Sequence, residues 1–561
     1  MTTALALSIL RAEHRALLSD VSDGNRVFWV GSGLSRGVVP MLPELIYRVL
    51  GFLQANAAEG DSNDPHLATL EALVARHLPL ELANLKADPK GWALPTPSEL
   101  EPLARFYADI FAERVPGKDP DYILWNAVDV PHTFGDPSLT PSSNHILLAL
   151  LMLEGVVSEV ASGNWDGLIE KAVANLNANA PSELAVLITN ESFRVETGTI
   201  HLYKFHGCAV KALNSPNEYR PLLIGRSNDI AGWPVDPRFN EVRVHMSALA
   251  RIRPTLFLGL SVQDYNLMLT LIGAGVMNPW PWDESHPAYL FSEISLTTAQ
   301  TGLLEKLYPS EYVSDSAEID ARSALGMYSL DVLSAVALHV VSEKIRRLSA
   351  RSKIFADDAD RESSTSDGSA GLETEFARVG SEALQLLELL TGGLSSTVAQ
   401  FTGDSHTTAY QPIFSGPAHQ ATTSSQPDRD ATTELAAILT VLGLGAASGR
   451  WQLSLLGTPG QCGFVKVKAM SGGSDVLIAI VRDVSSANTV LASSEWATSA
   501  DRLLLLQTSG SGVSNTTRSV ARGLGSGRSR SGKSSLWVDD FLRDRNSSAA
   551  VLSQFAEAIG A

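Results

Sequence analysis

The sequence contains few cysteines, no excess of basic residues and no long hydrophobic run. Its 561 residues include two cysteines, Cys208 and Cys462, too few for a four-cysteine zinc site or a disulfide framework. The formal net charge of -18 excludes a basic nucleic-acid-binding surface over the whole chain but leaves room for a local patch. The most apolar segment near the middle, 145–157, is too short to span a bilayer and contains Glu154. The first residues lack the basic region and cleavage site of a signal peptide, so we predict a cytoplasmic protein with no membrane contact.

The length and composition predict a globular protein of two or three domains. Hydrophobic residues make up 44% and charged residues 19% of the chain, as in soluble globular proteins. A chain of 561 residues is too long for one ordinary core. Residues 351–372 are polar and have little apolar periodicity, which predicts a linker. We therefore predict a first domain over 1–350 and a smaller C-terminal α/β domain over 373–561.

Short apolar runs alternate with helical patterns in the first domain. Strands are predicted at 27–30, 156–161, 185–188, 200–205, 255–258 and 288–291. Helices are predicted at 42–53, 66–87, 98–115, 142–155 and 319–348. Strands separated by helices indicate a Rossmann-like, doubly wound parallel sheet that is covered on both faces.

The C-terminal domain has weaker signals. We expect a helix over 373–390 that is stopped by Gly392 and Gly393, then a loop over 402–430. Strands are expected at 451–456, 464–468, 476–481, 503–506 and 536–539, and a helix at 548–559.

A glycine-rich sequence, GSGLS at 31–35, follows the first predicted strand directly. Glycines at the end of a strand let the backbone approach a pyrophosphate, and a following helix offers its N–H groups. The spacing differs from G-x-G-x-x-G because Arg36 stands where the third glycine is expected. By itself, such a segment is more often a plain turn.

Three further polar clusters each follow a predicted strand. They are SGNWD at 162–166, KFHG at 204–207 and GLSVQD at 259–264. Each has a structural alternative: the first and third suit the N-cap of a helix, and a single histidine is often a packing residue. Taken together, all four clusters fall at the carboxyl edge of one sheet, where open α/β folds bind ligands.

These four motifs, in this order, resemble the sirtuin family (silent information regulator 2), and especially its bacterial defence branch. That family has G-A-G-x-S, T-x-N-x-D, H-G and G-x-S-x-x-D in the same order, and the resemblance covers about residues 20–310. Ser32 replaces the family's alanine, and Ser162-Gly163 replaces the residues before the family's asparagine. The four-cysteine zinc module of protein-deacylating sirtuins is missing, so no zinc is expected.

The resemblance implies roles for individual residues. The cofactor-binding residues it implies are Gly31, Ser32, Gly33, Ser35, Gly259, Ser261 and Asp264. Of these, the residues at 31–35 would cradle the pyrophosphate. Asn164 would hold the nicotinamide ribose or the attacking water, with Asp166 steadying its loop, and His206 would act as general base. Cys208 could be a nucleophile, although a small residue packed behind the site is the favoured interpretation.

The resemblance implies an NAD+ hydrolase that cleaves the nicotinamide–ribose bond and acts as an antiviral defence effector. Two alternatives stay open: NAD-dependent protein deacylation, and a sensor that binds NAD or ADP-ribose without turnover. In this family the enzymes are often held inactive until infection is sensed, with a HerA-like ATPase or a short Argonaute protein as partner. A homo-oligomer and such a partner are therefore expected, with the C-terminal domain as a sensor, oligomerisation or docking module.

One further motif, GRSRSGKS at 527–534, matches the P-loop pattern. The preceding residues are rich in Ser, Gly and Arg instead of forming a buried strand, and few residues remain after it, so we do not expect an ATP site. The basic stretch 518–533 has no acidic residue and could contact nucleic acid or an acidic partner, although a solvated loop is the favoured interpretation.

Overall fold

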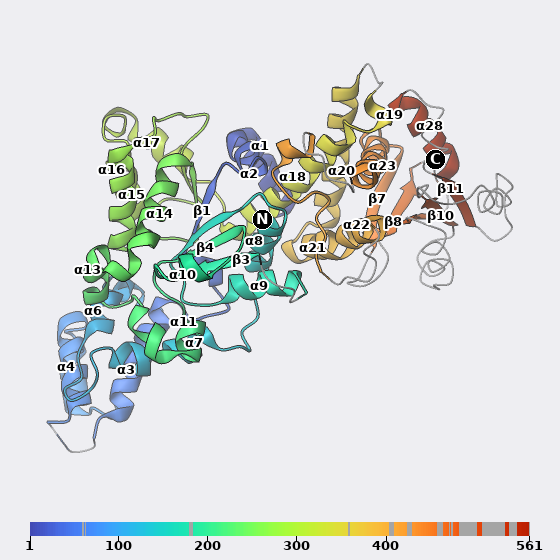
Figure 1. Cartoon of the computed structure of the whole chain (residues 1–561). Helices are drawn as coiled ribbons and strands as arrows, with labels where there is room; N and C mark the ends of the chain where they lie inside the picture. The colour runs from blue at the N-terminus through green and yellow to red at the C-terminus, as the bar shows by residue number, and fades with distance from the viewer. Residues whose placement is uncertain are drawn as a thin grey trace.

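The chain forms two α/β regions, each built around its own sheet (Figure 1). The computed structural model describes residues 1–58, 61, 63–178, 183–356, 360–402, 409–422, 429–456, 464–470, 472, 475–481, 502–507, 533–537 and 547–559.

The first sheet has six strands, and every neighbouring pair is parallel. The strands are β1 (Val27–Val30), β2 (Glu159–Ser162), β3 (Leu184–Leu187), β4 (Ile200–Lys204), β5 (Thr255–Leu258) and β6 (Tyr289–Phe291). Their order is β3-β4-β2-β1-β5-β6. The strands on one side of β1 (β2, β3 and β4) therefore come earlier in the sequence than those on the other side (β5 and β6). The predicted α/β class and parallel sheet are confirmed. The reversal of strand order creates a crevice at the carboxyl end of β1, where open sheets bind ligands.

Helices cover both faces of this sheet, because alternate side chains of its strands enter different cores. Phe28 and Val30 of β1 belong to one core, whereas Val27 and Trp29 belong to the other, and all four side chains are fully buried. The helices outside the insertion described below are α1 (Thr3–Glu13), α2 (Arg15–Ser22), η1 (Ser32–Ser35), α8 (Ser143–Leu153), α9 (Leu168–Leu176), α10 (Ser192–Val195), α11 (Ala209–Asn214), α12 (Pro216–Tyr219), η4 (Arg220–Leu222), α13 (Ser227–Gly232), η5 (Trp233–Val235), η6 (Pro237–Phe239), α14 (Asn240–Ile252), α15 (Tyr265–Met277), α16 (Thr298–Leu307), α17 (Tyr312–Ser323) and α18 (Ser329–Ser349).

A helical insertion between β1 and β2 has a hydrophobic core that is separate from the two sheet cores. It contains α3 (Leu42–Asn56), α4 (Pro65–His77), α5 (Leu82–Ala87), η2 (Glu101–Phe106), α6 (Tyr107–Ala112), η3 (Ile123–Ala127) and α7 (Val130–Gly135). The helices predicted at 66–87 and 98–115 are each divided in two. Pro79 follows the end of α4, where a proline restricts the residue before it and cannot continue the hydrogen bonding.

The second region packs helices against a mixed sheet of order β11-β10-β9-β8-β7. Strands β7 to β9 pair antiparallel, and β9 to β11 pair parallel. Its elements are α19 (Lys353–Ala356), α20 (Arg361–Val379), α21 (Ala383–Leu387), η7 (Glu388–Leu394), α22 (Ser395–Thr402), η8 (Ala418–Thr422), α23 (Arg429–Ala447), β7 (Trp451–Leu456), β8 (Phe464–Ala469), β9 (Val476–Val481), β10 (Arg502–Gln507), β11 (Lys533–Trp537) and α28 (Ser548–Ile559).

The linker predicted over 351–372 is wrong, because this range contains α19 (Lys353–Ala356) and the start of α20. This helix has small residues instead of an apolar stripe, and they let it lie against the backbone of α23. A Cβ on Gly443 would stand 1.9 Å from the carbonyl oxygen of Gly368, so both positions require glycine. Close backbone packing of this kind leaves no hydrophobic periodicity in the sequence.

Two other helix boundaries differ from prediction. Gly392 and Gly393 do not stop a helix; they lie inside the π-helical segment η7, which continues into α22. The helix predicted over 319–348 is two helices, α17 and α18, separated by a turn in which Gly326 has a φ of 66°. The positive φ at that glycine is a backbone conformation that ends a helix.

Candidate active site

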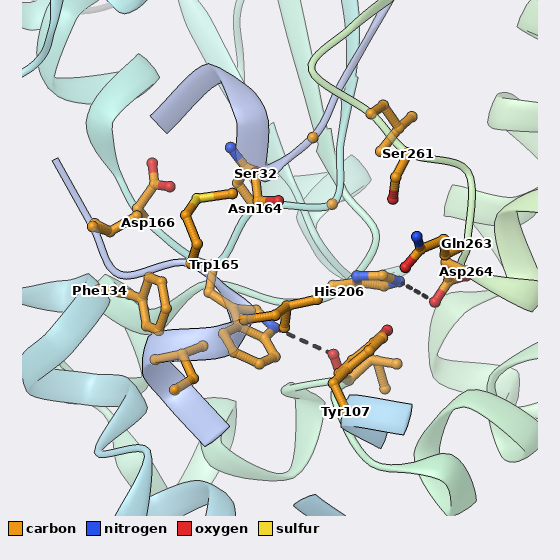
Figure 2. A pocket seen from close by; sticks show the side chains of 18 of the residues that line it. Ser32, Tyr107, Phe134, Asn164, Trp165, Asp166, His206, Ser261, Gln263 and Asp264 are labelled. Atoms are coloured by element: carbon orange, nitrogen blue, oxygen red, sulfur yellow. Dashed lines mark hydrogen bonds and ion pairs between the residues drawn. The ribbon is translucent and has the colours of Figure 1, made fainter. Parts of the chain in front are cut away.

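A cleft opens at the carboxyl end of β1, between the loops that follow β2, β4 and β5 (Figure 2). Its empty space is about 900 Å³, a volume that includes the part open to solvent. Seven of the ten residues predicted from the sequence line it: Gly31, Ser32, Asn164, Asp166, His206, Ser261 and Asp264. The other three, Gly33, Ser35 and Gly259, are not among its lining residues.

The two glycine-bearing loops pack against each other. The N–H groups of Gly31 and Gly33 donate to the carbonyl oxygens of Leu258 and Gly259, at 3.0 and 2.9 Å. A Cβ on Gly33 would stand 2.7 Å from the Cα of Gly259, which itself has a φ of 59°. These glycines therefore hold the ends of β1 and β5 together, and their N–H groups are already bonded within the protein.

Ser35 lies beneath the cleft instead of facing it. Its side chain is fully buried, and its hydroxyl donates to Oδ2 of Asp166 at 2.8 Å. The amide Nδ2 of Asn164 donates to the same hydroxyl oxygen at 3.1 Å. Ser35 thus connects the two polar residues of the β2 loop, and both of those residues border the cleft.

Asp264 is the N-cap of α15, whereas Asp166 lies one residue before Gly167, the N-cap of α9. Oδ1 of Asp166 accepts from the N–H of Leu168 at 3.1 Å, next to the start of α9. Oδ1 of Asp264 accepts from the N–H of Leu267 at 2.9 Å in the first turn of α15. Each carboxylate has a second oxygen with another partner, so the structural and site roles are compatible.

His206 and Asp264 form a pair on one wall of the cleft (Figure 2). Nε2 of His206 lies 3.2 Å from Oδ2 of Asp264, and neither atom has another hydrogen-bond partner among the described residues. Burial would raise the pKa of Asp264, but His206 and the backbone N–H groups of the α15 turn together hold it below its ordinary value. The carboxylate is therefore ionised and orients the imidazole.

Tyr107, from α6 of the insertion, faces this pair across the cleft (Figure 2). Burial, together with the nearby Asp264 carboxylate, raises the pKa of Tyr107 above its ordinary value. Its phenol stays protonated at neutral pH. The sequence does not single out Tyr107, since nothing in its local pattern distinguishes it from a packing tyrosine.

The remaining wall is apolar and comes mostly from the insertion. Phe134 and Trp165 meet edge to face, with ring centroids 5.3 Å apart. Trp165 Nε1 donates to the carbonyl oxygen of Ile224 at 3.3 Å, which fixes the indole. The other apolar side chains of this part are Val39, Pro40, Met41, Leu42 and Leu45. The cleft therefore offers a planar aromatic ligand an apolar chamber beside a group of polar residues.

A second cavity shares Ser32, Met41, Leu42, Ser261 and Gln263 with the first. Among the described residues that line either cavity, Arg36 is the single arginine or lysine. Its guanidinium makes no hydrogen bond or ion pair with another described side chain. Burial raises the pKa of Glu293, and the charge of the nearby Arg36 opposes that shift.

Cys208 lies behind the cleft and is 3% exposed, in agreement with the packing interpretation. Its Sγ is 3.6 Å from Nζ of the buried Lys204, which also contacts Glu170 at 3.0 Å and donates to the carbonyl oxygen of Asp166. Lys204 therefore supports the β2 loop from below. Cys462 falls outside the described residues.

Comparison with protein-family models and with curated proteins gave no match for this chain. Within the part of the chain that the structure describes, no three or more His, Cys, Asp or Glu residues are grouped so as to hold a metal ion. No described helix is long and apolar enough to cross a membrane.

Proposed function

We propose that this protein binds NAD+ in the cleft and hydrolyses the bond between nicotinamide and ribose. The observation that carries the proposal is the meeting of Asn164, Asp166, His206 and Asp264 in one cavity at the point where the strand order reverses. The resemblance to sirtuins supports the proposal independently, because it rests on the order of four motifs in the sequence.

The shape and chemistry of the cleft suit a dinucleotide. The nicotinamide ring would occupy the apolar chamber at Phe134 and Trp165, beside the amide of Asn164. The rest of the molecule would extend past Ser32 and Ser261 into the second cavity. There the pyrophosphate would meet Arg36, because Gly31 and Gly33 have no free N–H group to offer it.

The reaction needs positioning and charge stabilisation more than a strong base. The positively charged nicotinamide leaves as a neutral molecule when its bond to C1′ of the ribose breaks, which leaves an oxocarbenium-like sugar. Water attacks C1′, and His206 accepts the proton that the water loses, with Asp264 stabilising the imidazolium. The products are nicotinamide, ADP-ribose and one proton. Asn164 and Asp166 are held in place by Ser35, so they would meet the developing charge without rearrangement.

The biological part of the proposal rests on the resemblance alone. We propose an antiviral effector that depletes NAD+ once a partner activates it, and that acts in the cytoplasm as a homo-oligomer. A HerA-like ATPase or a short Argonaute protein would be that partner.

The decisive experiment is incubation of the purified full chain with NAD+, following nicotinamide and ADP-ribose by chromatography. Formation of both products in equal amounts supports hydrolysis. Saturable NAD+ binding with no product, also in the presence of a candidate partner, would instead support a sensor. Consumption of NAD+ that requires an acetyl-lysine peptide and yields an acetylated ADP-ribose would support deacylation and contradict the proposal.

A further inference from the structure

His145 is a buried histidine that lies directly beneath the cleft but is not one of its lining residues. It belongs to the first turn of α8, and its imidazole contacts a different partner at each ring nitrogen. Nδ1 accepts from the backbone N–H of Ser142 at 3.1 Å and lies 2.8 Å from the Ser142 hydroxyl. Because Nδ1 is the acceptor, the ring proton must be on Nε2.

Nε2 of His145 lies 3.1 Å from the hydroxyl oxygen of Ser35. That hydroxyl has one hydrogen to donate and two lone pairs that accept. The hydroxyl donates its hydrogen to Oδ2 of Asp166, 2.8 Å away. The two lone pairs must then accept from His145 Nε2 and from Asn164 Nδ2.

This assignment determines which end of the Asn164 amide faces the cleft. The NH2 group is directed to Ser35, so the carbonyl Oδ1 is left for the cavity. Burial lowers the pKa of His145 while the nearby Asp166 opposes that effect, and the net lowering favours the neutral ring that the assignment requires.

We propose that His145 is a positioning residue that acts through Ser35 to hold the Asn164 carbonyl oxygen toward the substrate. The oxygen accepts a hydrogen bond from the attacking water or from a ribose hydroxyl. Because the amide of Asn164 is fixed, it cannot flip and turn its NH2 group toward the substrate. This inference rests on the proposed NAD+ hydrolysis for its catalytic part, but its hydrogen-bond assignment stands apart from any activity.

A matched pair of substitutions tests the catalytic part. In His145→Gln the side-chain amide reaches Ser35 and its oxygen still accepts from Ser142. In His145→Asn the oxygen can accept from Ser142 and preserve the helix cap, but the side chain is too short to reach Ser35. We expect His145→Asn to lower kcat roughly 10-fold with a smaller change in KM, and His145→Gln to recover most of the loss, the size expected for one hydrogen bond. His66→Asn, at a buried histidine of α4, is the control and should retain wild-type kcat.

A double substitution separates positioning from general destabilisation. Because His145 acts through Ser35, Ser35→Ala combined with His145→Asn should lower kcat no more than Ser35→Ala alone. Fully additive losses, equal activity of the Asn and Gln variants, or an effect on KM alone would overturn the proposal. If His145→Asn does not fold, as judged by thermal unfolding, Ser35→Ala and His145→Gln still give the comparison.

The hydrogen-bond assignment has its own readout, which does not depend on turnover. Histidine-selective 15N NMR of the full chain should show His145 as the neutral tautomer with its proton on Nε2, and the His145→Gln variant identifies the signal. A proton on Nδ1 would overturn the inference even if NAD+ is hydrolysed. If the tautomer is correct but the wild-type protein does not cleave NAD+, the proposed function fails and the assignment remains.

Discussion

The two sheets of this protein use similar strands but differ in direction, and loops of the first sheet meet at one cleft. All six strands of the first sheet are parallel, so the loops after β1, β2, β4 and β5 leave the same edge. In the second sheet, β8 is antiparallel to both of its neighbours, and its carboxyl end faces the opposite edge. Parallel order therefore lets four short motifs, far apart in the chain, meet at one cleft.

The helices around the two sheets also make contact in different ways. In the first region, large apolar side chains of α8 and α18 fill the space against the sheet. In the second, α20 and α23 approach so closely that Gly368, Gly371 and Gly443 have no room for a side chain. One continuous core nevertheless includes residues of both regions. Both regions are therefore well packed, although by different side chains. We infer that strand direction and loop chemistry, and not the quality of packing, determine where the cleft forms.

The largest expected effect is loss of turnover when the cleft is altered. Asn164→Ala and His206→Ala should each lower NAD+ consumption by roughly 10²–10⁴-fold, the usual cost of removing a general base or a group that stabilises developing charge. His419→Ala, at a half-exposed histidine of the second region, is the matched control and should retain full activity. Nicotinamide release is measured on variants whose melting temperature is unchanged. Wild-type turnover in either cleft variant would contradict the site assignment.

Acid stability should differ between the regions, because the first contains buried histidines such as His14. Burial, opposed in part by Glu13 and reinforced by Arg322 and Arg26, lowers the pKa of His14 from 6.5 to about 4. Between pH 6.5 and 4 the unfolded chain therefore binds a proton that the folded chain does not. The free energy of unfolding falls as the pH drops through this window, by about 3 kcal/mol in total for this group.

Replacing His14 with glutamine should remove that part of the pH dependence. Urea unfolding of His14→Gln at pH 7 and pH 4 is compared with the wild type and with His419→Gln. The His14→Gln protein should lose less stability on acidification than either of the others. An identical loss in all three proteins would show that His14 is already protonated in the folded state.

A smaller effect is expected at Arg36, which lines the second cavity. Arg36→Ala should raise the KM for NAD+ roughly 10-fold with little change in kcat, as expected if Arg36 binds the pyrophosphate equally in the ground and transition states. Binding of ADP-ribose should weaken similarly, whereas binding of nicotinamide riboside, which has no phosphate, should not. Arg76→Ala, an exposed arginine of the insertion, is the control. Equal weakening for the riboside would exclude a phosphate contact.

The smallest expected effect concerns the P-loop pattern of the second region. Lys533 begins strand β11 instead of a helix, whereas a P-loop places its lysine at a strand-to-helix turn that cradles phosphate. Lys533→Ala should leave NAD+ hydrolysis unchanged, and calorimetry with ATP and magnesium should detect no binding to either protein. Saturable binding that disappears in the variant would show that the second region has a nucleotide site after all. The other residues of the basic stretch 518–533 lie outside the described residues, as does the start of the motif.

Much of the first region follows from local patterns in the sequence. Short apolar runs bounded by glycine and polar residues located all six strands, with ends within three residues of those in the structure. The polar motifs followed those strands in the sequence, and seven of their predicted residues line the cleft. The helix α20 was missed because a helix packed through glycine and serine has no apolar stripe.

The sequence by itself determined which polar residues stand at the carboxyl ends of the strands, because strand and motif are neighbours in the chain. Tertiary structure alone decided which of them face the cleft. Ser35 turns inward because Asp166, Asn164 and His145, more than 100 residues away, together satisfy its hydroxyl. It also decided that the insertion supplies Tyr107 and the apolar wall, since a hydrophobic pattern shows that a side chain is buried but not what it is buried against.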